Sequence, residues 1–236
     1  MTTRVLIILG FLASTLAFGQ VPPTNLTGEY KFTSGSLSDT QGSNNFTQTG
    51  SSLTTTTDRL GNAGDAVLLN GDHLQRTYLF SGDLSVSFWI KTTTNNGNMT
   101  TIIDQSTRSG DAENSTTGWY IYLQNGKVGV AGNFGAYAPY ASPLAGGWSG
   151  NSGYLSTIGT SDVSDNDWHH VTVTMQRSVF RASGGPWYRF QYFYKVYVDN
   201  VLENSGTSQV NTPTLSGGNS YSFSGTANLL LTTTNV

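Results

Sequence analysis

Cysteine is absent from the 236 residues of this chain. Disulfides and thiol chemistry are therefore excluded, and an exported domain of this kind must be stable through its hydrophobic core, which favours a bacterial origin. Charged residues are also scarce, at 11%, and the net charge is -3. That balance predicts no nucleic-acid partner. With 12% aromatic residues and 28 glycines, the surface is expected to recognise partners through hydrogen bonds and ring stacking.

Long apolar runs are missing except at the N-terminus. There, Arg4 precedes the run 5–13, and the small residues around Ala17 and Gly19 follow it. This order is typical of a secretory signal peptide, and the run is shorter than the roughly 20 residues of a membrane-spanning helix. We therefore expect a signal peptide at residues 1–19, a secreted or cell-surface location, and no membrane span after signal removal.

Helical periodicity is missing as well, whereas short stretches of alternating apolar and polar residues recur. The segments predicted as strands are 28–32, 85–91, 119–123, 127–130, 195–198 and the residues from 201 onward. The pairs Asn125-Gly126 and Asp199-Asn200 are typical of tight hairpin turns between them. After a short linker at 20–27, residues 28–236 are thus predicted to form one all-β domain, an antiparallel sandwich or barrel.

Two adjacent histidines stand in the stretch "DNDWHHVTVTMQ", residues 165–176. Val171, Val173 and Met175 alternate with polar residues from His170 onward, which is the pattern of a half-buried strand. Neighbouring strand residues point to opposite faces, so His169 and His170 are not expected to bind one metal together. The stretch is interpreted as the start of a core strand.

Several blocks together carry a family resemblance. They are "GEYKF", "DTQGSNN", "TDRLGNAGDAVLLNGDHL", "LSVSFWIKT", "DNDWHHVTVTM" and "KVYVDNVLENSG", which follow one another between residues 28 and 205. In this order they resemble the laminin-G-like, concanavalin A-like domains, in particular those of exported proteins of Bacteroidetes. The resemblance implies a two-sheet antiparallel jelly-roll sandwich that binds glycans or proteins, often beside a structural calcium ion.

The C-terminal end departs from that family pattern. Such domains usually close with a strand of the form Gly, branched residue, Asp-Asp and alternating apolars, whereas this sequence ends after "ANLLLTTT" at 227–234. Either the sequence is a fragment, or 227–234 is the last strand and one edge stays open. In the first case the strand 28–32 would lack its neighbour and favour self-association through strand pairing.

Catalysis is not predicted. A glycoside hydrolase needs two carboxylates that flank the sugar bond, and the sequence has three glutamates, Glu29, Glu113 and Glu203. Glu29 and Glu203 lack an acidic neighbour two residues away, and Asp111 with Glu113 lies in a polar loop.

Two aromatic segments are candidates for ligand binding. The first is the long, uncharged segment 133–160, and the second follows Gly-Gly-Pro at an expected hairpin tip. Their candidate residues are Phe134, Tyr137, Tyr140, Trp148 and Tyr154 in the first segment, and Trp187 and Tyr188 in the second. These rings could stack on sugars, or they could pack the segments onto the sandwich.

Calcium is expected to be structural if it binds. Asp39 with Asn44 matches the acidic turn of the family, and Asp104 with Asp111 is the weaker pair. The alternative is that each side chain caps its own turn. If Asp39 holds calcium, added calcium should raise the melting temperature, and Asp39→Ala should abolish the rise.

These observations predict an exported, non-catalytic binding module for a polysaccharide or a cell-surface glycoprotein. The alternative is a structural or adhesive surface protein with a protein partner, and a glycoside hydrolase is a third possibility.

Overall fold

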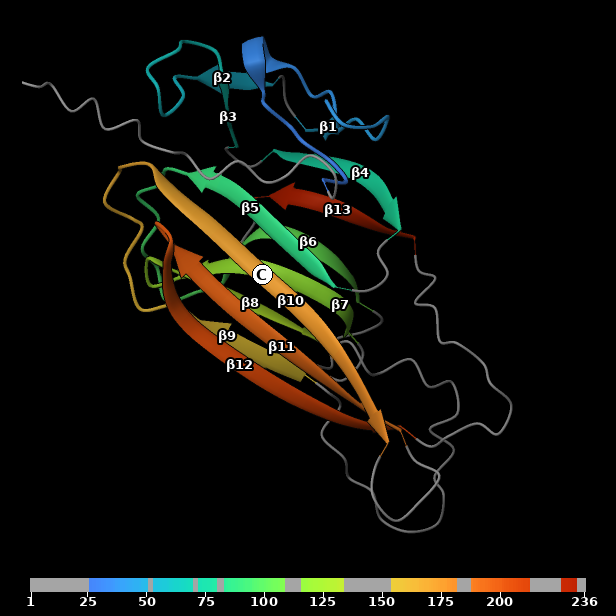
Figure 1. The fold of residues 1–236 in the computed structure, drawn as a ribbon. Coiled ribbons are helices and arrows are strands. Elements are labelled where there is room, and N and C mark those ends of the chain that lie inside the picture. Colours follow the sequence, from blue (N-terminus) through green and yellow to red (C-terminus); the bar gives the residue numbers. More distant parts are fainter. Residues whose placement is uncertain are drawn as a thin grey trace, which may run out of the picture.

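The computed structural model describes residues 26–50, 53–69, 72–79, 83–108, 116–133, 154–181, 188–212 and 226–232. Two antiparallel sheets stack face to face, with the smaller sheet in front in Figure 1. The larger sheet has seven strands in the order β1 (Thr47–Thr49), β4 (His73–Leu79), β13 (Thr226–Thr232), β6 (Thr100–Arg108), β7 (Thr116–Gln124), β8 (Lys127–Asn133) and β9 (Tyr154–Ile158).

The smaller sheet has four strands, in the order β12 (Val201–Thr212), β11 (Tyr188–Val198), β10 (His169–Arg181) and β5 (Leu84–Ile90). A separate pair, β2 (Thr54–Thr56) and β3 (Ala66–Leu68), and a short 3-10 helix, η2 (Thr33–Gly35), complete the regular structure of the described residues. The predicted all-β sandwich is confirmed.

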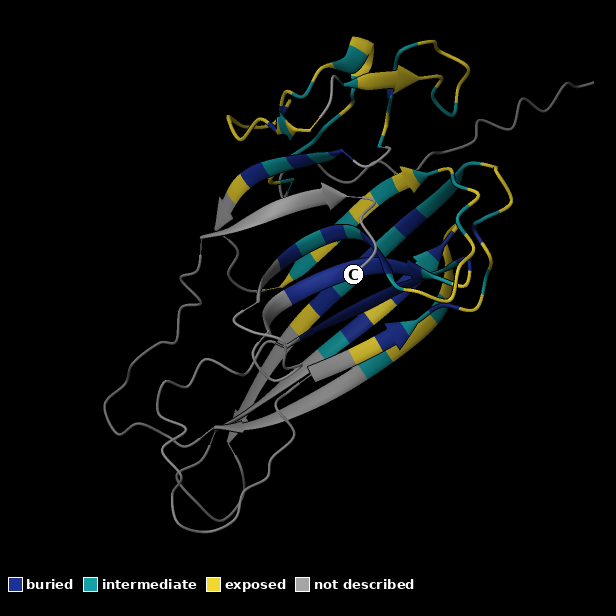
Figure 2. Cartoon of the chain, turned by 180° about the vertical axis from the view of Figure 1, so that it is seen from behind, coloured by how far each residue is buried: buried dark blue, intermediate teal, exposed yellow. Residues whose placement is uncertain are grey.

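The core lies between the two sheets and follows the alternation of each strand. The larger sheet contributes Ile103, Trp119, Ile121, Leu123, Val128 and Val130, and the smaller sheet contributes Val171, Val173, Met175, Tyr194, Val196 and Val198. Partly buried Val86, Phe88 and Ile90 of β5 pack against this cluster. In Figure 2 the buried residues lie in the central strands, whereas the N-terminal strands carry mostly intermediate and exposed residues.

Both predicted hairpin turns are confirmed. Asn125 and Gly126 join β7 to β8 with φ angles of 50° and 70°, and Asp199 and Asn200 join β11 to β12 with φ angles of 49° and 68°. Positive φ at both central residues gives the turn a twist that matches the flanking strands, and asparagine, aspartate and glycine tolerate it best.

The predicted strand at 28–32 is wrong. These residues have no regular secondary structure, and Phe32 and Ser34 turn the chain with φ angles of 55° and 51°. The Glu29 carbonyl accepts the Thr40 amide at 2.9 Å, and the Tyr30 ring packs on Phe46 with centroids 4.2 Å apart. Because these tertiary contacts with Thr40 and Phe46 hold residues 28–32 in another conformation, strand pairing of this segment with another chain loses its structural basis.

Residues 226–232 of this C-terminal segment form β13, which lies inside the larger sheet rather than at its edge. Within it, β13 pairs with β4 on one side, over Thr226–Thr232, and with β6 on the other, at Leu230 and Leu231. The edges of the larger sheet are β1 and β9.

The N-terminal segment docks onto β4 around one arginine. Arg76 is 8% exposed, its Cζ lies 5.3 Å from the centroid of the Tyr30 ring, and its Nη1 lies 3.8 Å from Asp39 Oδ2. Nη1 also donates to the Tyr30 hydroxyl. This buried cation therefore joins an acid and two rings, those of Tyr30 and Phe46, to the sandwich.

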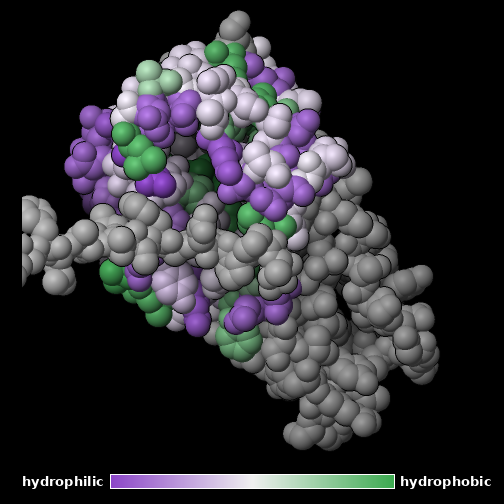
Figure 3. All heavy atoms as spheres, turned by 45° about the horizontal axis from the view of Figure 1, so that its top comes forward, coloured by the Kyte–Doolittle hydropathy of each residue, from purple (hydrophilic) through white to green (hydrophobic). Residues whose placement is uncertain are grey.

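Large apolar side chains at the surface are few and scattered. Among the described residues they are Leu60, Leu68, Trp89, Val201 and Leu202. In Figure 3, which brings the N-terminal end forward, hydrophobic residues form separate groups among hydrophilic ones. Within the described ranges, no helical segment has the length and apolar character needed to traverse a bilayer.

Candidate functional site

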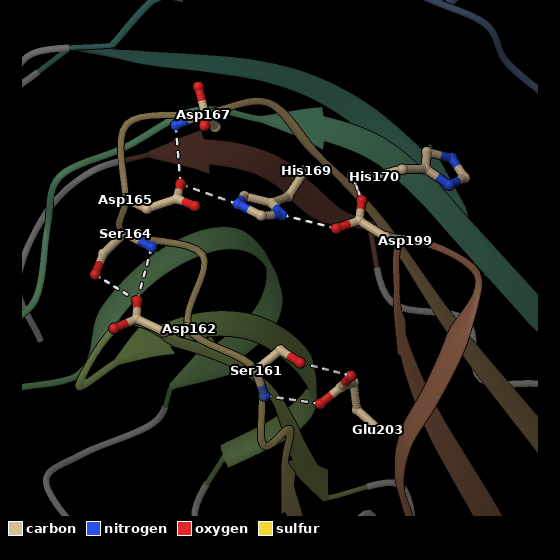
Figure 4. Close-up of polar contacts among 9 residues, drawn as sticks. All are labelled: Ser161, Asp162, Ser164, Asp165, Asp167, His169, His170, Asp199 and Glu203. Carbon is tan, nitrogen blue, oxygen red and sulfur yellow. Dashed lines mark hydrogen bonds and ion pairs between the residues drawn. The ribbon is translucent and has the colours of Figure 1, made fainter.

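His169 and His170 begin strand β10, and their side chains point in opposite directions (Figure 4). The strand predicted from the alternation is confirmed, because Val171, Val173 and Met175 are 0%, 0% and 3% exposed. The two rings consequently make different contacts, one with the loop before the strand and one with the outer face of the smaller sheet.

His169 lies between two carboxylates. Its Nδ1 is 2.8 Å from Asp199 Oδ2, and its Nε2 is 3.0 Å from Asp165 Oδ1. Burial lowers the pKa of His169, but Asp199 and Asp165 raise it, and the net shift is upward. The ring thus joins the turn after β11 to the loop before β10. The role of His169 in this arrangement is structural.

Glu203 likewise holds the loop between β9 and β10, at the end of the loop that follows β9. Its carboxylate accepts the backbone amides of Thr160 and Ser161 at 2.9 and 2.7 Å, and it accepts both hydroxyls as well. Burial raises the pKa of Glu203, but these four donors lower it to about 2. A carboxylate held in this way ties β12 to the chain after β9, and it is a poor general acid.

Glu203→Gln should alter the acid stability of the fold. A pKa lowered from 4.5 to about 2 means that Glu203 stabilises the native state above about pH 4.5 and loses this contribution between about pH 4.5 and 2. The difference in melting temperature between wild type and variant should be largest above pH 5 and vanish near pH 2. Calorimetry at several pH values measures it. A difference that is independent of pH would contradict this role.

The two histidines should respond to pH with opposite signs. The pKa of His169 is raised, so its contribution to stability is full below about pH 6.5 and is lost as the pH rises through the raised value. Burial lowers the pKa of His170, as does Arg59, against Asp199, which raises it. The contribution of His170 is therefore lost as the pH falls below about 6.5.

The measurement compares melting temperatures of His169→Gln, His170→Gln and wild type between pH 5.5 and 8.5. The difference from wild type should shrink with rising pH for His169→Gln and with falling pH for His170→Gln. The same trend in both variants would contradict opposite pKa shifts of the two histidines.

His170 belongs to a polar and aromatic face on the outside of the smaller sheet. It pairs across the strands with Trp89, and the two ring centroids are 5.0 Å apart. Its Nε2 is 2.7 Å from Ser87 Oγ, and the Thr172 hydroxyl donates to the same Ser87 oxygen at 3.3 Å. Trp89 is 40% exposed. We call the outward residues of β5 and β10, namely Ser85, Ser87, Trp89, His170, Thr172 and Thr174, the Trp89 face.

Arg59 reaches the Trp89 face from the turn between β2 and β3. Its Cζ lies 4.5 Å from the centroid of the Trp89 ring, within the range of a cation–π contact. Asp58 holds the turn, because its Oδ1 accepts the amides of Leu60 and Asn62 at 2.9 and 2.8 Å. Both of these hydrogen bonds of the Asp58 carboxylate thus lie within the turn. The turn places Arg59 beside an exposed tryptophan.

The aromatic residues predicted to bind ligand lie mostly outside the described residues. Phe134, Tyr137, Tyr140, Trp148 and Trp187 fall there entirely. For Tyr154 and Tyr188 the structure describes the backbone: Tyr154 begins β9 opposite Asn133, and Tyr188 begins β11 opposite Arg181. The end of the segment 133–160 is thus a strand, and Tyr188 lies at the expected hairpin. The ligand-binding role of all seven residues stays a prediction.

Asp39 and Asn44 lie on the N-terminal segment. The Asp39 Oδ1 atom accepts the amides of Glu29 and Gln41, each at 3.0 Å, and Arg76 lies near Oδ2. The Asn44 carbonyl accepts the Tyr30 hydroxyl. Calcium at Asp39 would therefore compete with Arg76 and with backbone donors. Throughout the described ranges, no three acidic or histidine side chains are grouped so that they could hold a metal. Calcium binding stays a prediction.

Comparison with known families identifies the fold. A laminin-G family model, described as the concanavalin A-like lectin/glucanases superfamily, matches residues 60–228. The chain belongs to this superfamily. The match contains all four strands of the smaller sheet, which include the Trp89 face, and most of the larger sheet, whereas Arg59, Asp39 and Asn44 precede it. The predicted family and fold class are confirmed.

Among solved structures, an endo-β-1,4-glucuronan lyase from the fungus Trichoderma reesei resembles this concanavalin A-like chain. The two are 10% identical, the TM-score is 0.33, and the alignment covers 77% of this chain and 74% of the lyase chain. At that level the likeness carries no argument about activity. A search of curated proteins found no match.

Sequence reasoning missed Trp89 and Arg59 as site residues. The signal was nevertheless present, because Val86, Phe88 and Ile90 alternate within the predicted strand 85–91, and this alternation puts Trp89 on the opposite face. A tryptophan on an otherwise hydroxyl-rich outer face has an apolar ring with a polar N–H group, the kind of side chain that is enriched at interfaces. The contact of Arg59 with Trp89 joins positions 30 residues apart along the chain, and no local pattern predicts it.

Proposed function

We propose that this chain is an exported, non-catalytic module that binds a polysaccharide or a cell-surface glycoprotein, and that the Trp89 face is its binding surface. The observation that carries the proposal is that Trp89, which is 40% exposed, lies beside His170 and Arg59. An aromatic ring offers a flat apolar surface for the C–H groups of a sugar, and the neighbouring polar groups can bond its hydroxyls.

The hydroxyl groups beside Trp89 support this proposal. Ser87 and Thr172 lie side by side on neighbouring strands and, with His170, form a connected hydrogen-bond network. Each hydroxyl both donates and accepts, so the network can adapt to the donors and acceptors of a sugar. Because these residues belong to β5 and β10, whose inner faces pack on the core, the surface is held rigidly before a ligand arrives, which favours binding.

The carboxyl groups support the non-catalytic part of the proposal. Glycosidases use a general acid whose pKa is raised. Each described carboxyl group with a resolved shift has a lowered pKa instead; these groups are Glu29, Asp39, Asp58, Asp162, Asp165 and Glu203. Hydrogen bonds to these carboxylates explain why their pKa values are lowered, and the carboxylates have structural roles. Incubation with laminarin or agar is expected to release no reducing sugar at catalytic rates.

Trp89→Ala should lower glycan affinity by about tenfold or more without unfolding the domain. The residue is partly exposed, so its loss removes contact area from a ligand while the core cluster remains intact. A glycan array with wild-type protein identifies a ligand, and titration calorimetry then compares wild type, Trp89→Ala and Trp148→Ala. Circular dichroism verifies that each variant is folded.

The outcomes of this comparison decide between the candidate surfaces. Loss with Trp89→Ala and retention with Trp148→Ala supports the Trp89 face. The reverse result would move the binding surface to the segment 133–160. A blank array together with a stable protein complex would favour the alternative function, protein binding, for which the exposed Val201 and Leu202, 61% and 49% accessible, are the described surface feature.

A further inference from the structure

We infer that the Trp89 face binds an extended stretch of a linear polysaccharide, which lies across the strands of the smaller sheet, rather than the terminal sugar of a glycoprotein. This inference rests on the proposed function and narrows its two ligand classes to one. It starts from a second outward ring, that of Tyr197 on β11, which lies next to the Trp89 face. The position of this ring relative to Trp89 decides how long a ligand the surface accommodates.

Tyr197 belongs to a row of outward residues that crosses the whole smaller sheet. Ser87 of β5 lies opposite Thr172 of β10, and Thr172 lies opposite Tyr197 of β11. Tyr197 in turn lies opposite Leu202 of β12. Residues directly opposite one another share a face of the sheet. We call these four residues the Tyr197 row; it runs across the four strands of the smaller sheet, which lies in front in Figure 1.

The core beneath β11 fixes the direction of the Tyr197 side chain. Its two neighbours, Val196 and Val198, are 0% and 4% exposed and pack between the sheets. Because neighbouring strand residues point to opposite faces, Tyr197 points outward, and it is half-buried. The packed strand holds its backbone in place before a ligand arrives, so less conformational entropy is lost on binding.

A β-bulge brings Leu202 into the row. The pairing of β11 with β12 shifts by one residue between Val196 and Tyr197, and the extra residue on β12 is Glu203. Glu203 holds the loop after β9 through its carboxylate, whereas Leu202, 49% exposed, stays beside Tyr197. Bulges re-aim side chains in this way. The apolar Leu202 side chain thus extends the row beyond the Tyr197 ring.

Trp89 and Tyr197 are too far apart for one sugar to cover both. Trp89 lies opposite His170, and Tyr197 lies opposite Thr172, two residues further along β10. The two aromatic residues are therefore two strands apart across the sheet and two residues apart along it, a separation of about 12 Å from the usual spacings of a sheet. A single pyranose ring does not span this separation, whereas a chain of linked sugars does.

The surface between the two aromatic residues is polar. His170 Nε2 lies 2.7 Å from Ser87 Oγ, and the Thr172 hydroxyl donates to the same oxygen at 3.3 Å. A linear sugar chain offers C–H surfaces to aromatic rings and hydroxyls to the groups between them. A lone terminal sugar would use one ring and leave the other in water. The arrangement therefore suits the internal sugars of a chain.

A length series of oligosaccharides, measured on the full chain by titration calorimetry, tests this inference. Oligomers of increasing length are prepared from laminarin, agar, xylan and mannan, and terminal glycans of glycoproteins are measured beside them. In at least one series the affinity should rise by about tenfold or more where the oligomer first reaches both rings, because the second contact is then intramolecular. Longer oligomers should gain little more, and blocking both chain ends should leave their affinity unchanged.

Variants locate the second contact. Tyr197→Ala should lower the affinity of long oligomers by about tenfold and leave short ones unchanged, so that the step in the series disappears. Tyr197→Phe keeps the ring and should keep most of the step, whereas Trp89→Ala should weaken every length. Phe193→Ala is the matched control, because Phe193 is a half-buried outward residue of the same strand that lies opposite Gln176, outside the row. Circular dichroism verifies that each variant is folded.

The outcomes separate this inference from the proposed function. Equal affinity of short and long oligomers, weakened by Trp89→Ala, would overturn the extended ligand and leave the proposed function standing, and so would binding of terminal glycans alone. A step that persists in Tyr197→Ala would overturn the path across the strands, and a step lost in Phe193→Ala would place the sugar chain along β11 instead. Absence of binding to every oligomer and terminal glycan would overturn the proposed function itself.

Discussion

Arg76→Met is expected to destabilise the fold by about 3–5 kcal/mol, the usual cost of breaking a buried ion pair from one side. The Asp39 side chain has no exposed surface and that of Arg76 is 6% exposed. Burial raises the pKa of Asp39, but amides of Glu29, Gln41 and Gly42, with Arg76, lower it. The carboxylate would therefore remain ionised in the variant, buried without its cation.

Chemical denaturation of wild type and Arg76→Met measures this loss. Lys31→Met is the matched control, because the Lys31–Glu29 pair is 3.4 Å apart but has side-chain exposures of 60% and 34%. Exposed pairs contribute about 0–1 kcal/mol. Adding Asp39→Asn to Arg76→Met should recover part of the loss, because the charge is removed while an amide oxygen can still accept the backbone donors. A loss below about 1 kcal/mol in Arg76→Met would contradict the described role of the pair.

Ile121→Ala should cost about 2–5 kcal/mol. Ile121 is 0% exposed in the middle of β7 and belongs to the cluster between the two sheets. Its neighbours come from both sheets, which have fixed backbones, so the cavity left by the lost carbons cannot close fully. Equilibrium unfolding in urea gives the change in the free energy of unfolding.

Ile121→Val provides the graded control, with an expected cost of about 0.5–1.5 kcal/mol for one methylene group. A substitution on the outer face, Thr174→Ala, should change the free energy of unfolding by less than about 1 kcal/mol. If Ile121→Ala and Thr174→Ala cost the same, residue 121 does not face the core of the sandwich.

Alternation and turn chemistry were sufficient to predict the central part of the fold. Val171, Val173 and Met175 pointed to a core strand, and Asn125-Gly126 pointed to a hairpin, because both signals depend on neighbouring residues. The segment 28–32 also alternates, but contacts of Tyr30 with Phe46 and of Glu29 with Thr40 hold it in another conformation. Tertiary contacts of this kind override a short local pattern.

The candidate site was harder to predict because it too depends on contacts between residues that are far apart in the sequence. The Trp89 face depends on strand β5 lying beside β10, which brings Trp89 to His170 from 81 positions away. Its arginine comes from a third element, the turn after β2. Composition predicted a surface rich in amide and aromatic side chains, but it could not indicate which ring lies beside which polar group.

The central claim is that a glycan contacts the outward Trp89 ring, and an NMR titration tests it most directly. The chain has five tryptophans, so five indole N–H signals are expected, and Trp89→Phe assigns the signal of residue 89. Trp119, 2% exposed in the core, is the internal reference. We predict that the Trp89 signal shifts and saturates with the affinity measured by calorimetry while the Trp119 signal stays in place. A bound glycan that leaves the Trp89 signal unmoved would contradict the account.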